Sequence, residues 1–493
     1  MGGVVMKINI TRKDWLFLIA CIGLGILAEV SFLHGRVGLS YLVFISGFYL
    51  VVLLRFRLSF NHRRIGLLFM VVIWILSGSY LFYDNQLFHN LNLLLIPILI
   101  FSHIVLITSP NTFKWDTPRF INLLITKLRE GRQYVAAFAN ASLNGLFKHE
   151  NRKTAQTVKR ILCGLAIGLP LLILITSLLM SADTIFQDVI LRLPIYLFPA
   201  NFLEGLLRFL FIMFVSFSLF GVFQVLKRRQ ISHDKYNKQA RKVMHWNSIT
   251  AMTILVMMNV VYLLFVVIQF RYFFNNDLME GFTYASYARR GFFELILVMI
   301  INWTILISFL KYVTDRRRGI KLTLNILYSS LIIMSGIMLA SGYGRLTMYE
   351  EAYGFTLDRV LAHAFMIYLM VTFSYTFIRV WIEKISLLHF YLIVGLIFYT
   401  MLNAINIEQL IVDKNLERYE QTGKIDVYYL DSLSYPGWDG LIQLYEMEED
   451  YPALQPILKE RQEWQAGQPS EKWQSFNFAK QKIAKELEEL DLR

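Results

Sequence analysis

The 493-residue chain has two cysteines, ten prolines and few charged residues. Two cysteines are too few for a disulfide framework or a zinc ribbon, and both lie in apolar stretches, which favours small buried side chains. Charged residues make up 17% of the chain and hydrophobic residues 56%, whereas soluble proteins have about 25% and about 45–50%. The composition therefore excludes a secreted disulfide-rich domain, a disordered protein and an ordinary cytosolic enzyme.

Common enzyme signatures are also absent. The chain has no glycine-rich dinucleotide loop, no phosphate loop, no His-Glu-x-x-His and no Gly-x-Ser-x-Gly. Membrane glycosyltransferases resemble one another in an acidic residue in the first external loop. Here that predicted loop, His34–Arg36, has none, although Glu29 lies near it. We expect a non-enzymatic protein without a metal or cofactor, and a membrane-embedded glycosyl- or lipid-transferring enzyme stays as an alternative.

The chain does have eleven apolar runs that are long enough to cross a membrane. A helix needs about 20 apolar residues to span about 30 Å of hydrocarbon, and continuous runs of this length indicate helices rather than barrel strands. The predicted fold class is therefore an all-α polytopic bundle embedded in the lipid bilayer. The predicted spans are Trp15–Leu33, Val37–Leu54, Ile65–Tyr83, Leu91–Thr108, Ile161–Met180, Leu203–Leu226, Ser248–Phe270, Phe292–Leu310, Leu322–Ala340, Val360–Trp381 and Leu387–Ile405.

Lysine and arginine are distributed unevenly between alternate loops. One set of loops holds 31 basic residues and the other set holds seven. Because loops rich in basic residues stay in the cytoplasm, the N-terminus is predicted inside and the C-terminus outside. The net charge of +13 is thus explained by orientation in the membrane, and we expect no nucleic-acid partner.

The chain divides into a membrane domain, residues 1–405, and a polar segment, residues 406–493. Their net charges are +21 and −8. Apolar residues at helical spacing predict that the polar segment is a small acidic helical domain outside the cytoplasm, leaning on the outer loops. Its predicted helices are Asn406–Glu420, Asp426–Ser434, Leu454–Trp464 and Phe476–Leu490, with a break at Tyr435-Pro436-Gly437.

The long cytoplasmic loop, residues 109–160, contains a predicted amphipathic helix. Pro118 is typical of a first helical position. Such a helix, with basic residues beside its apolar face, suits the inner surface of the bilayer, and a docking site for a cytoplasmic protein partner is the alternative. The apolar residues at helical spacing are Phe120, Leu123, Leu124 and Leu128.

Several ionisable residues lie inside the predicted spans or near their ends. A charge at the centre of a span costs about 2.5–3.5 kcal/mol, so each residue needs an explanation. Glu204 and Arg208 are four residues apart and can pair on one helix face. Glu29 and Glu294 have no partner within their own spans, and His103 sits late in the fourth span. These residues either line an ion- or proton-linked path or hold helices together.

Polar residues also gather in two predicted external connections. Ser181 and Asp183 follow the fifth span, where they either join a binding site or cap a following helix. The predicted loop 341–359 carries two arginines, three carboxylates and three tyrosines, which suits a binding site at the outer face. The candidate residues are Ser181, Asp183, Arg345, Glu350, Glu351, Tyr353, Thr356 and Arg359.

Several of these segments resemble a family of bacterial polytopic membrane proteins. The family is catalogued only as a domain of unknown function, under two related numbers, 4153 and 4173, that these residues do not separate, and the resemblance covers about residues 160–450. It implies bacterial origin and placement in the cytoplasmic membrane, and it transfers no catalytic residue. The resemblance rests on Ser181-Ala182-Asp183, Tyr287–Glu294, Tyr353-Gly354-Phe355-Thr356 with Arg359, and Asn415-Leu416-Glu417-Arg418-Tyr419.

Two functional hypotheses follow. The leading hypothesis is a sensing or regulatory component that binds a solute, lipid or envelope partner at its outer face and responds through loop 109–160. The main alternative is an ion- or proton-coupled transporter whose path is lined by Glu29, Glu204, Arg208 and Glu294. No internal repeat supports an inverted-repeat transporter.

Overall fold

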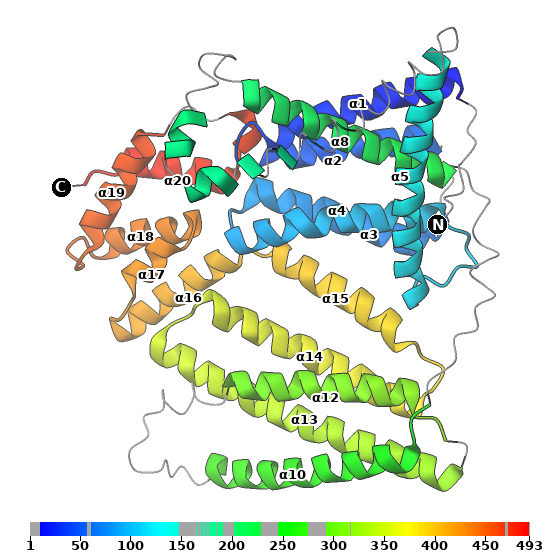
Figure 1. The fold of residues 1–493 in the computed structure, drawn as a ribbon. Helices are drawn as coiled ribbons and strands as arrows, with labels where there is room; N and C mark the ends of the chain where they lie inside the picture. The colour runs from blue at the N-terminus through cyan, green and yellow to red at the C-terminus, as the bar shows by residue number, and fades with distance from the viewer. Residues whose placement is uncertain are drawn as a thin grey trace. The chain divides into compact units, whose positions relative to one another are not determined.

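The computed structural model describes residues 10–56, 61–146, 202–227, 245–274, 292–315, 317–468 and 472–492, with positions 164, 168, 171–172, 175–176, 178–183 and 185–190. Over these residues the chain forms helices and no β-strand (Figure 1). The predicted all-α fold is therefore confirmed.

Ten helices in the described residues are long and apolar enough to cross a membrane. Each coincides with a predicted span, and the chain is a multi-pass membrane protein. The remaining predicted span, Ile161–Met180, lies mostly outside the described residues. The ten helices are α1 (Arg12–Phe32), α2 (Leu39–Phe56), α3 (Arg63–Phe82), α4 (Gln86–Thr108), α8 (Phe202–Lys227), α10 (Ser248–Phe274), α12 (Phe292–Tyr312), α13 (Arg318–Tyr353), α14 (Leu357–Trp381) and α15 (Leu387–Ala404).

Packing divides the chain into two compact units. The first unit comprises Met1–Leu81, Leu94–Ile231 and Glu471–Phe476. The second comprises Phe82–Leu93, Ser232–Ser470 and Asn477–Arg493. Helix α4 begins in the second unit and continues in the first. The proposed division into residues 1–405 and 406–493 stays a prediction.

The prediction of an external loop at residues 341–359 is wrong. Helix α13 continues to Tyr353, and only Gly354–Thr356 separates it from α14. Isolated glycines inside a helix cost about 1 kcal/mol each, which the packing of a long helix overcomes. The helix ends at Gly354, whose φ of +83° lies in the left-handed region that favours glycine.

Close approaches between helices organise the first unit. A Cβ on Gly25 of α1 would lie 2.2 Å from Ser216 Oγ of α8. A Cβ on Gly221 of α8 would lie 2.5 Å from the carbonyl oxygen of Gly131. Gly131 belongs to α5 (Pro118–Leu146), the helix predicted from Pro118. Because membrane helices gain little from hydrophobic burial, such small residues stabilise them by allowing close packing.

In the second unit, the C-terminal helices share one hydrophobic core. Leu430, Leu441, Leu444 and Leu458 lie at its centre, and Phe88 of α4 joins it. Polar residues cap these helices, as Asn406 and Asp426 accept hydrogen bonds from Gln409 N and Tyr429 N. The helices are α16 (Ile407–Thr422), α17 (Val427–Ser432), α18 (Tyr435–Met447), α19 (Leu454–Ala466) and α20 (Phe478–Glu489).

The predicted break at Tyr435-Pro436-Gly437 needs a correction. These residues form the first turn of α18, with proline in that turn. Proline ends a preceding helix and also suits the first turn of a new one, because that turn needs no amide donor. The sequence contained both signals, and the break alone was predicted.

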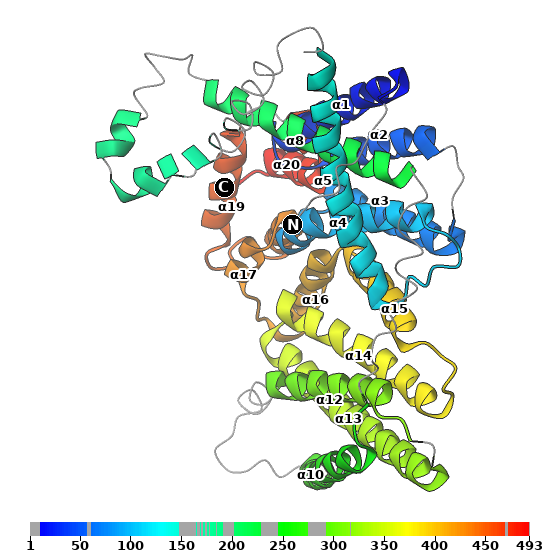
Figure 2. The same cartoon turned by 45° about the vertical axis from the view of Figure 1, so that its right-hand side comes forward.

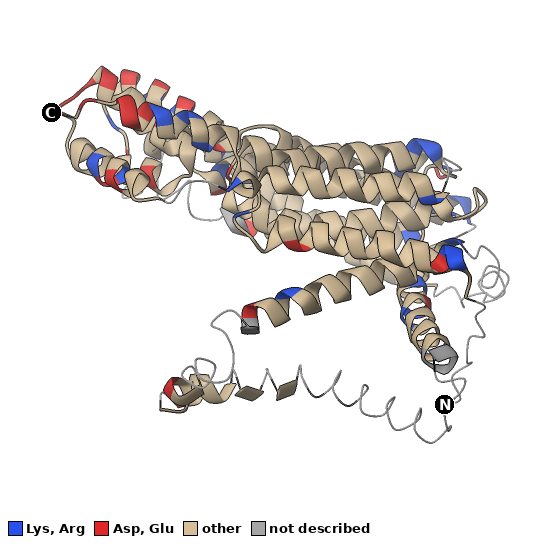
Figure 3. Ribbon diagram, turned by 90° about the horizontal axis from the view of Figure 1, so that it is seen from above, with Lys and Arg blue, Asp and Glu red and all other residues tan. Residues whose placement is uncertain are grey.

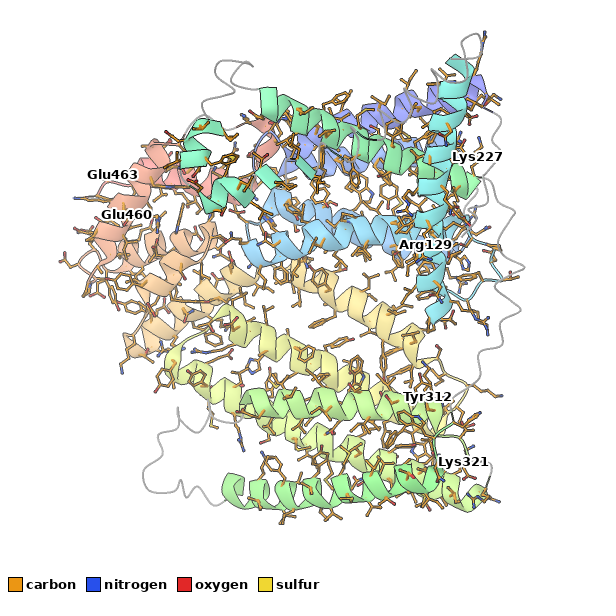
Figure 4. All side chains as sticks on the ribbon, viewed as in Figure 1. Arg129, Lys227, Tyr312, Lys321, Glu460 and Glu463 are labelled. Carbon is orange, nitrogen blue, oxygen red and sulfur yellow. The ribbon has the colours of Figure 1, made fainter. Side chains whose placement is uncertain are left out.

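Acidic and basic side chains gather at opposite ends of the second unit. Acidic residues gather on the C-terminal helices (Figure 3), where Glu460 and Glu463 lie (Figure 4). Tyr312 and Lys321 mark the opposite end of its membrane helices (Figure 4). The end marked by Tyr312 and Lys321 is the one that the predicted orientation assigns to the cytoplasm, and that orientation stays a prediction.

In the first unit, the tail contacts the connection between α1 and α2. The 3-10 helix η1 (Trp473–Ser475) belongs to this unit. Gly38 N donates to Gln474 O at 2.9 Å and Leu39 N to Phe476 O at 3.1 Å. Residues 474–476 thus lie at the end of α1 opposite to Arg12.

Candidate functional site

A buried carboxylate and an imidazole form the core of a polar site in the second unit. Glu350 comes from the last turn of α13 and His363 from α14. His363 Nδ1 lies 3.1 Å from Glu350 Oε2, and 2% of the Glu350 surface is exposed. Among the described residues, Glu350 Oε1 has no hydrogen-bond partner. Because an unsatisfied buried carboxylate oxygen is costly, this atom is an acceptor available to a ligand.

The second ring nitrogen of His363 also faces acceptors. His363 Nε2 lies 3.3 Å from Tyr343 O and 3.5 Å from Thr347 Oγ1. The Thr347 hydroxyl itself donates to Tyr343 O at 3.1 Å. One ring nitrogen thus faces a carboxylate of α13, and the other faces a hydroxyl and a carbonyl one and two turns earlier in the same helix. His363 was not among the residues predicted from the sequence, although a histidine within a predicted span was a usable signal.

The connection between α13 and α14 is held by the C-terminal helices. Asn415 of α16 donates to Phe355 O and accepts from Phe355 N, each at 2.9 Å. Arg418 donates to the carbonyl oxygens of Glu351 and Ala352, each at 2.8 Å. These carbonyls belong to the last turn of α13, which lacks partners within its own helix. Hydrogen bonds therefore connect the end of α13, where Glu350 lies, to α16.

Other predicted outer-face residues surround this connection without converging on one point. Arg359 stacks over the Tyr349 ring at 4.2 Å and donates to Gly354 O. Arg345 is buried in α13, and Thr356 is the N-cap of α14. Glu351 and Tyr353 have exposed side chains. Of the carboxylates predicted here, the structure buries Glu350.

Ser181 and Asp183 belong to the first unit and are exposed. Asp183 Oδ1 accepts hydrogen bonds from Ile185 N at 2.8 Å and Phe186 N at 3.3 Å. Residues 185–190 are helical, so Asp183 acts as the cap of a following helix, one of the two interpretations that the sequence left open.

A second polar cluster lies in the first unit, between α1 and α8. The predicted pair of Glu204 and Arg208 forms. Arg208 Nη1 also lies 3.5 Å from Glu29 Oε1. The Glu29 side chain is 8% exposed, whereas those of Arg208 and Glu204 are 31% and 59% exposed. Arg208 thus gives the buried carboxylate of Glu29 the partner that its own helix lacks.

His34 completes this cluster. His34 Nε2 accepts a hydrogen bond from Arg208 Nη1 at 2.8 Å, because the guanidinium is only a donor. His34 Nδ1 lies 3.4 Å from Glu29 Oε1. His34 therefore links Arg208 of α8 to Glu29 of α1 through its two ring nitrogens. His34 was noted in the predicted first external loop and was not assigned a role.

The remaining intramembrane candidates stand apart from both clusters. His103 Nδ1 lies 2.8 Å from the hydroxyl of Tyr49, and both side chains are buried in the first unit. Glu294 is exposed in the first turn of α12, without an ion pair to any other described residue. In the described part of the chain, no three His, Cys, Asp or Glu side chains meet in a group that could hold a metal ion.

Comparison with known families gives one match. The family model described as domain of unknown function (DUF4153) matches residues 70–444, well over half of the chain. The matched range includes both α13 and α14 and the Asn415–Tyr419 segment. No curated protein and no solved structure matches the chain.

Proposed function

The chain belongs to the DUF4153 family, and on that premise we propose that it is a non-enzymatic sensing component of the bacterial cytoplasmic membrane. It binds a polar solute, lipid headgroup or envelope partner at the outer ends of α13 and α14. The observation that carries this proposal is the buried Glu350, with Oε1 unpartnered among the described residues and Oε2 beside His363. A ligand group that donates a hydrogen bond, above all an ammonium, satisfies that oxygen.

The contacts of α16 supply a route for the response. Glu350 is buried and His363 is half-buried, so a ligand reaches the carboxylate when the ends of α13 and α14 separate. Those ends are held by Asn415 and Arg418. Ligand binding and the position of α16 are therefore thermodynamically linked, because a ligand shifts the equilibrium toward the state that it binds better.

Thermal unfolding of the full chain in nanodiscs tests this proposal. Ethanolamine is the ammonium probe and glycerol phosphate the anionic probe. We expect ethanolamine to raise the melting temperature of the wild type and not that of Glu350→Gln, since a ligand stabilises only the state that binds it. The matched control is Glu351→Gln, which removes the neighbouring exposed carboxylate and should keep the response. An equal response in Glu350→Gln and wild type would contradict the proposal.

A proton-coupled transporter is the second candidate, and the cluster of Glu29, His34, Glu204 and Arg208 favours it. Membrane-embedded carboxylates that pair with arginine and histidine are typical of proton relays. Vesicles with a trapped pH-sensitive dye would report flux driven by a pH gradient. Loss of flux in Glu29→Gln, with flux kept in Glu294→Gln, would support this candidate. Flux no faster than in protein-free vesicles would exclude it.

A further inference from the structure

Helix α5 lies crosswise to α1 and α8 in the first unit (Figures 1 and 2). Its buried face packs on the C-terminal part of α8, where Tyr134 and Phe138 contact the Phe220 ring at 5.8 Å and 4.9 Å between centroids. Phe138 also lies 5.2 Å from Trp15 at the start of α1. The start of α1 and the end of α8 are the ends that the basic residues assign to the cytoplasm. Helix α5 therefore runs along the surface at the level of those ends.

A second apolar face of α5 is exposed. Leu123 of the predicted stripe is buried, but Leu128 is 52% exposed, so the four predicted apolar residues do not share one environment. Ile121 and Ile125 are 60% and 44% exposed. Ile121, Ile125 and Leu128 follow one another at spacings of four and three residues, which places them on one side of the helix. This stripe lies beside the face that packs on α8.

Basic residues continue the exposed face. Arg129 follows Ile125 by four residues, and Arg132 follows Leu128 by four residues, and both arginines are exposed. Figure 4 labels Arg129 on α5 and Lys227 at the end of α8. Lys127, in contrast, is paired with Glu130 at 2.8 Å. A helix with large exposed apolar residues beside arginines matches an interface where hydrocarbon meets negative charge.

We infer that α5 binds the anionic phospholipids of the leaflet at the basic ends of the spans. Ile121, Ile125 and Leu128 enter the acyl-chain boundary, and Arg129 and Arg132 contact headgroup phosphates together with Arg119, which is exposed in the first turn of α5. The crosswise course of α5 keeps its length in the membrane plane, which a helix docked on a protein partner does not require. Guanidinium groups bind phosphate oxygens in a bidentate manner. Anionic lipids lack the ammonium that neutralises the phosphate of phosphatidylcholine, so the positive charge of the arginines favours anionic lipid.

Hydrogen exchange of the full chain in two kinds of nanodisc tests this inference. One disc contains phosphatidylcholine alone, and the other an equimolar mixture with phosphatidylglycerol. We expect several-fold slower amide exchange over residues 118–130 in the mixed discs. The triple variant Arg119→Gln, Arg129→Gln, Arg132→Gln should lose this difference. The charge-matched control Arg317→Gln, Arg318→Gln, Lys321→Gln, on a different helix, should keep it.

Two outcomes would overturn the inference. The first is equal exchange of residues 118–130 in both discs while α8 exchanges slowly in each. Slow exchange in α8 shows that the protein is folded, so α5 would then not respond to lipid charge. The second is protection that arises only when a cytosolic protein fraction is added, which would assign this face to a protein partner. Ile125→Ser checks the apolar part, and we expect faster exchange of the same residues in the mixed discs.

Discussion

The amide side chain of Asn415 satisfies both backbone groups of Phe355, accepting from its nitrogen and donating to its oxygen at 2.9 Å each. Phe355 is the middle residue of the three that join α13 to α14. One side chain from α16 thus replaces the hydrogen bonds that the backbone loses where the helix ends. The adjacent Gly354 has no room for a side chain, because its Cβ would lie 2.6 Å from Asn415 Oδ1.

Replacing Asn415 by alanine should destabilise the connection. Two partly buried backbone groups lose their partners, and the expected loss is about 1–3 kcal/mol of unfolding free energy. Hydrogen exchange at Phe355 and Leu357 should accelerate, whereas the middle of α14 should stay protected. The exposed amide Gln468 provides the control, and Gln468→Ala should match the wild type. Unchanged exchange at Phe355 in Asn415→Ala would show that the contact does not hold the connection.

Replacing Gly221 by alanine should separate α5 from α8. The added methyl group would lie 2.5 Å from Gly131 O and 2.7 Å from Val135 Cγ2, and such overpacking costs about 1–3 kcal/mol. Gly205→Ala on the same helix is the control, because its Cβ meets nothing within 4 Å and alanine favours a helix. Limited proteolysis of α5 and thermal unfolding would compare the two variants. Equal behaviour would contradict the close crossing.

Removing the Arg208 side chain should destabilise the fold, because the buried Glu29 carboxylate loses its cationic partner. Arg208→Gln leaves Glu29 without its cationic partner, and we expect a loss of about 1–3 kcal/mol in unfolding free energy. Glu204→Gln should change stability little, because Glu204 is mostly exposed. The double variant Arg208→Gln, Glu29→Gln should recover part of the loss. Denaturant unfolding in mixed micelles measures these variants and Glu29→Gln alone, and a loss in the double variant equal to the sum of the Arg208→Gln and Glu29→Gln losses would argue against a direct pairing.

Glu408 should make stability depend on pH. Burial raises the pKa of this carboxyl, and the hydrogen bond from Ser434 only partly offsets the effect. When the pKa is higher in the folded than in the unfolded state, the folded protein binds the extra proton, so stability falls as pH rises from about 4.5 through the raised pKa. The Glu408→Gln variant should therefore be as stable as the wild type below about pH 4.5 and more stable than the wild type at about pH 8. Melting curves of both proteins across this range test the sign.

Cysteine labelling tests the orientation. A single Glu460→Cys variant should react with a membrane-impermeant maleimide in intact cells, and Lys321→Cys only after lysis, because Glu460 lies in the acidic C-terminal helices and Lys321 at the opposite end of α13. The unmodified chain gives the background of the native thiols, of which Cys21 is buried. The reverse labelling pattern would place the C-terminal helices in the cytoplasm.

The positions of the helices could be predicted because they depend on local sequence. A run of apolar residues forms a spanning helix whatever surrounds it, since every backbone group must be bonded within the helix in lipid. Pro118 similarly indicated where α5 begins, and Asn406, Asp426 and Asn477 cap the helices that follow them. The end of α13 was harder to predict, because glycine is tolerated inside a helix and also ends one. At its end, Gly354 and Phe355 contact Asn415 of α16, and the local sequence does not encode this contact.

The sequence by itself thus determined an all-α membrane protein, the places of its spans and the distribution of its charge. The tertiary structure decided which polar groups meet. Arg208 reaches Glu29 from 179 residues away, and Asn415 reaches Phe355 from 60 residues away. Placing an ionisable residue inside a span costs free energy, and helix packing determines which partner offsets that cost. Sequence spacing reports only neighbours on the same helix, such as Glu204 and Arg208.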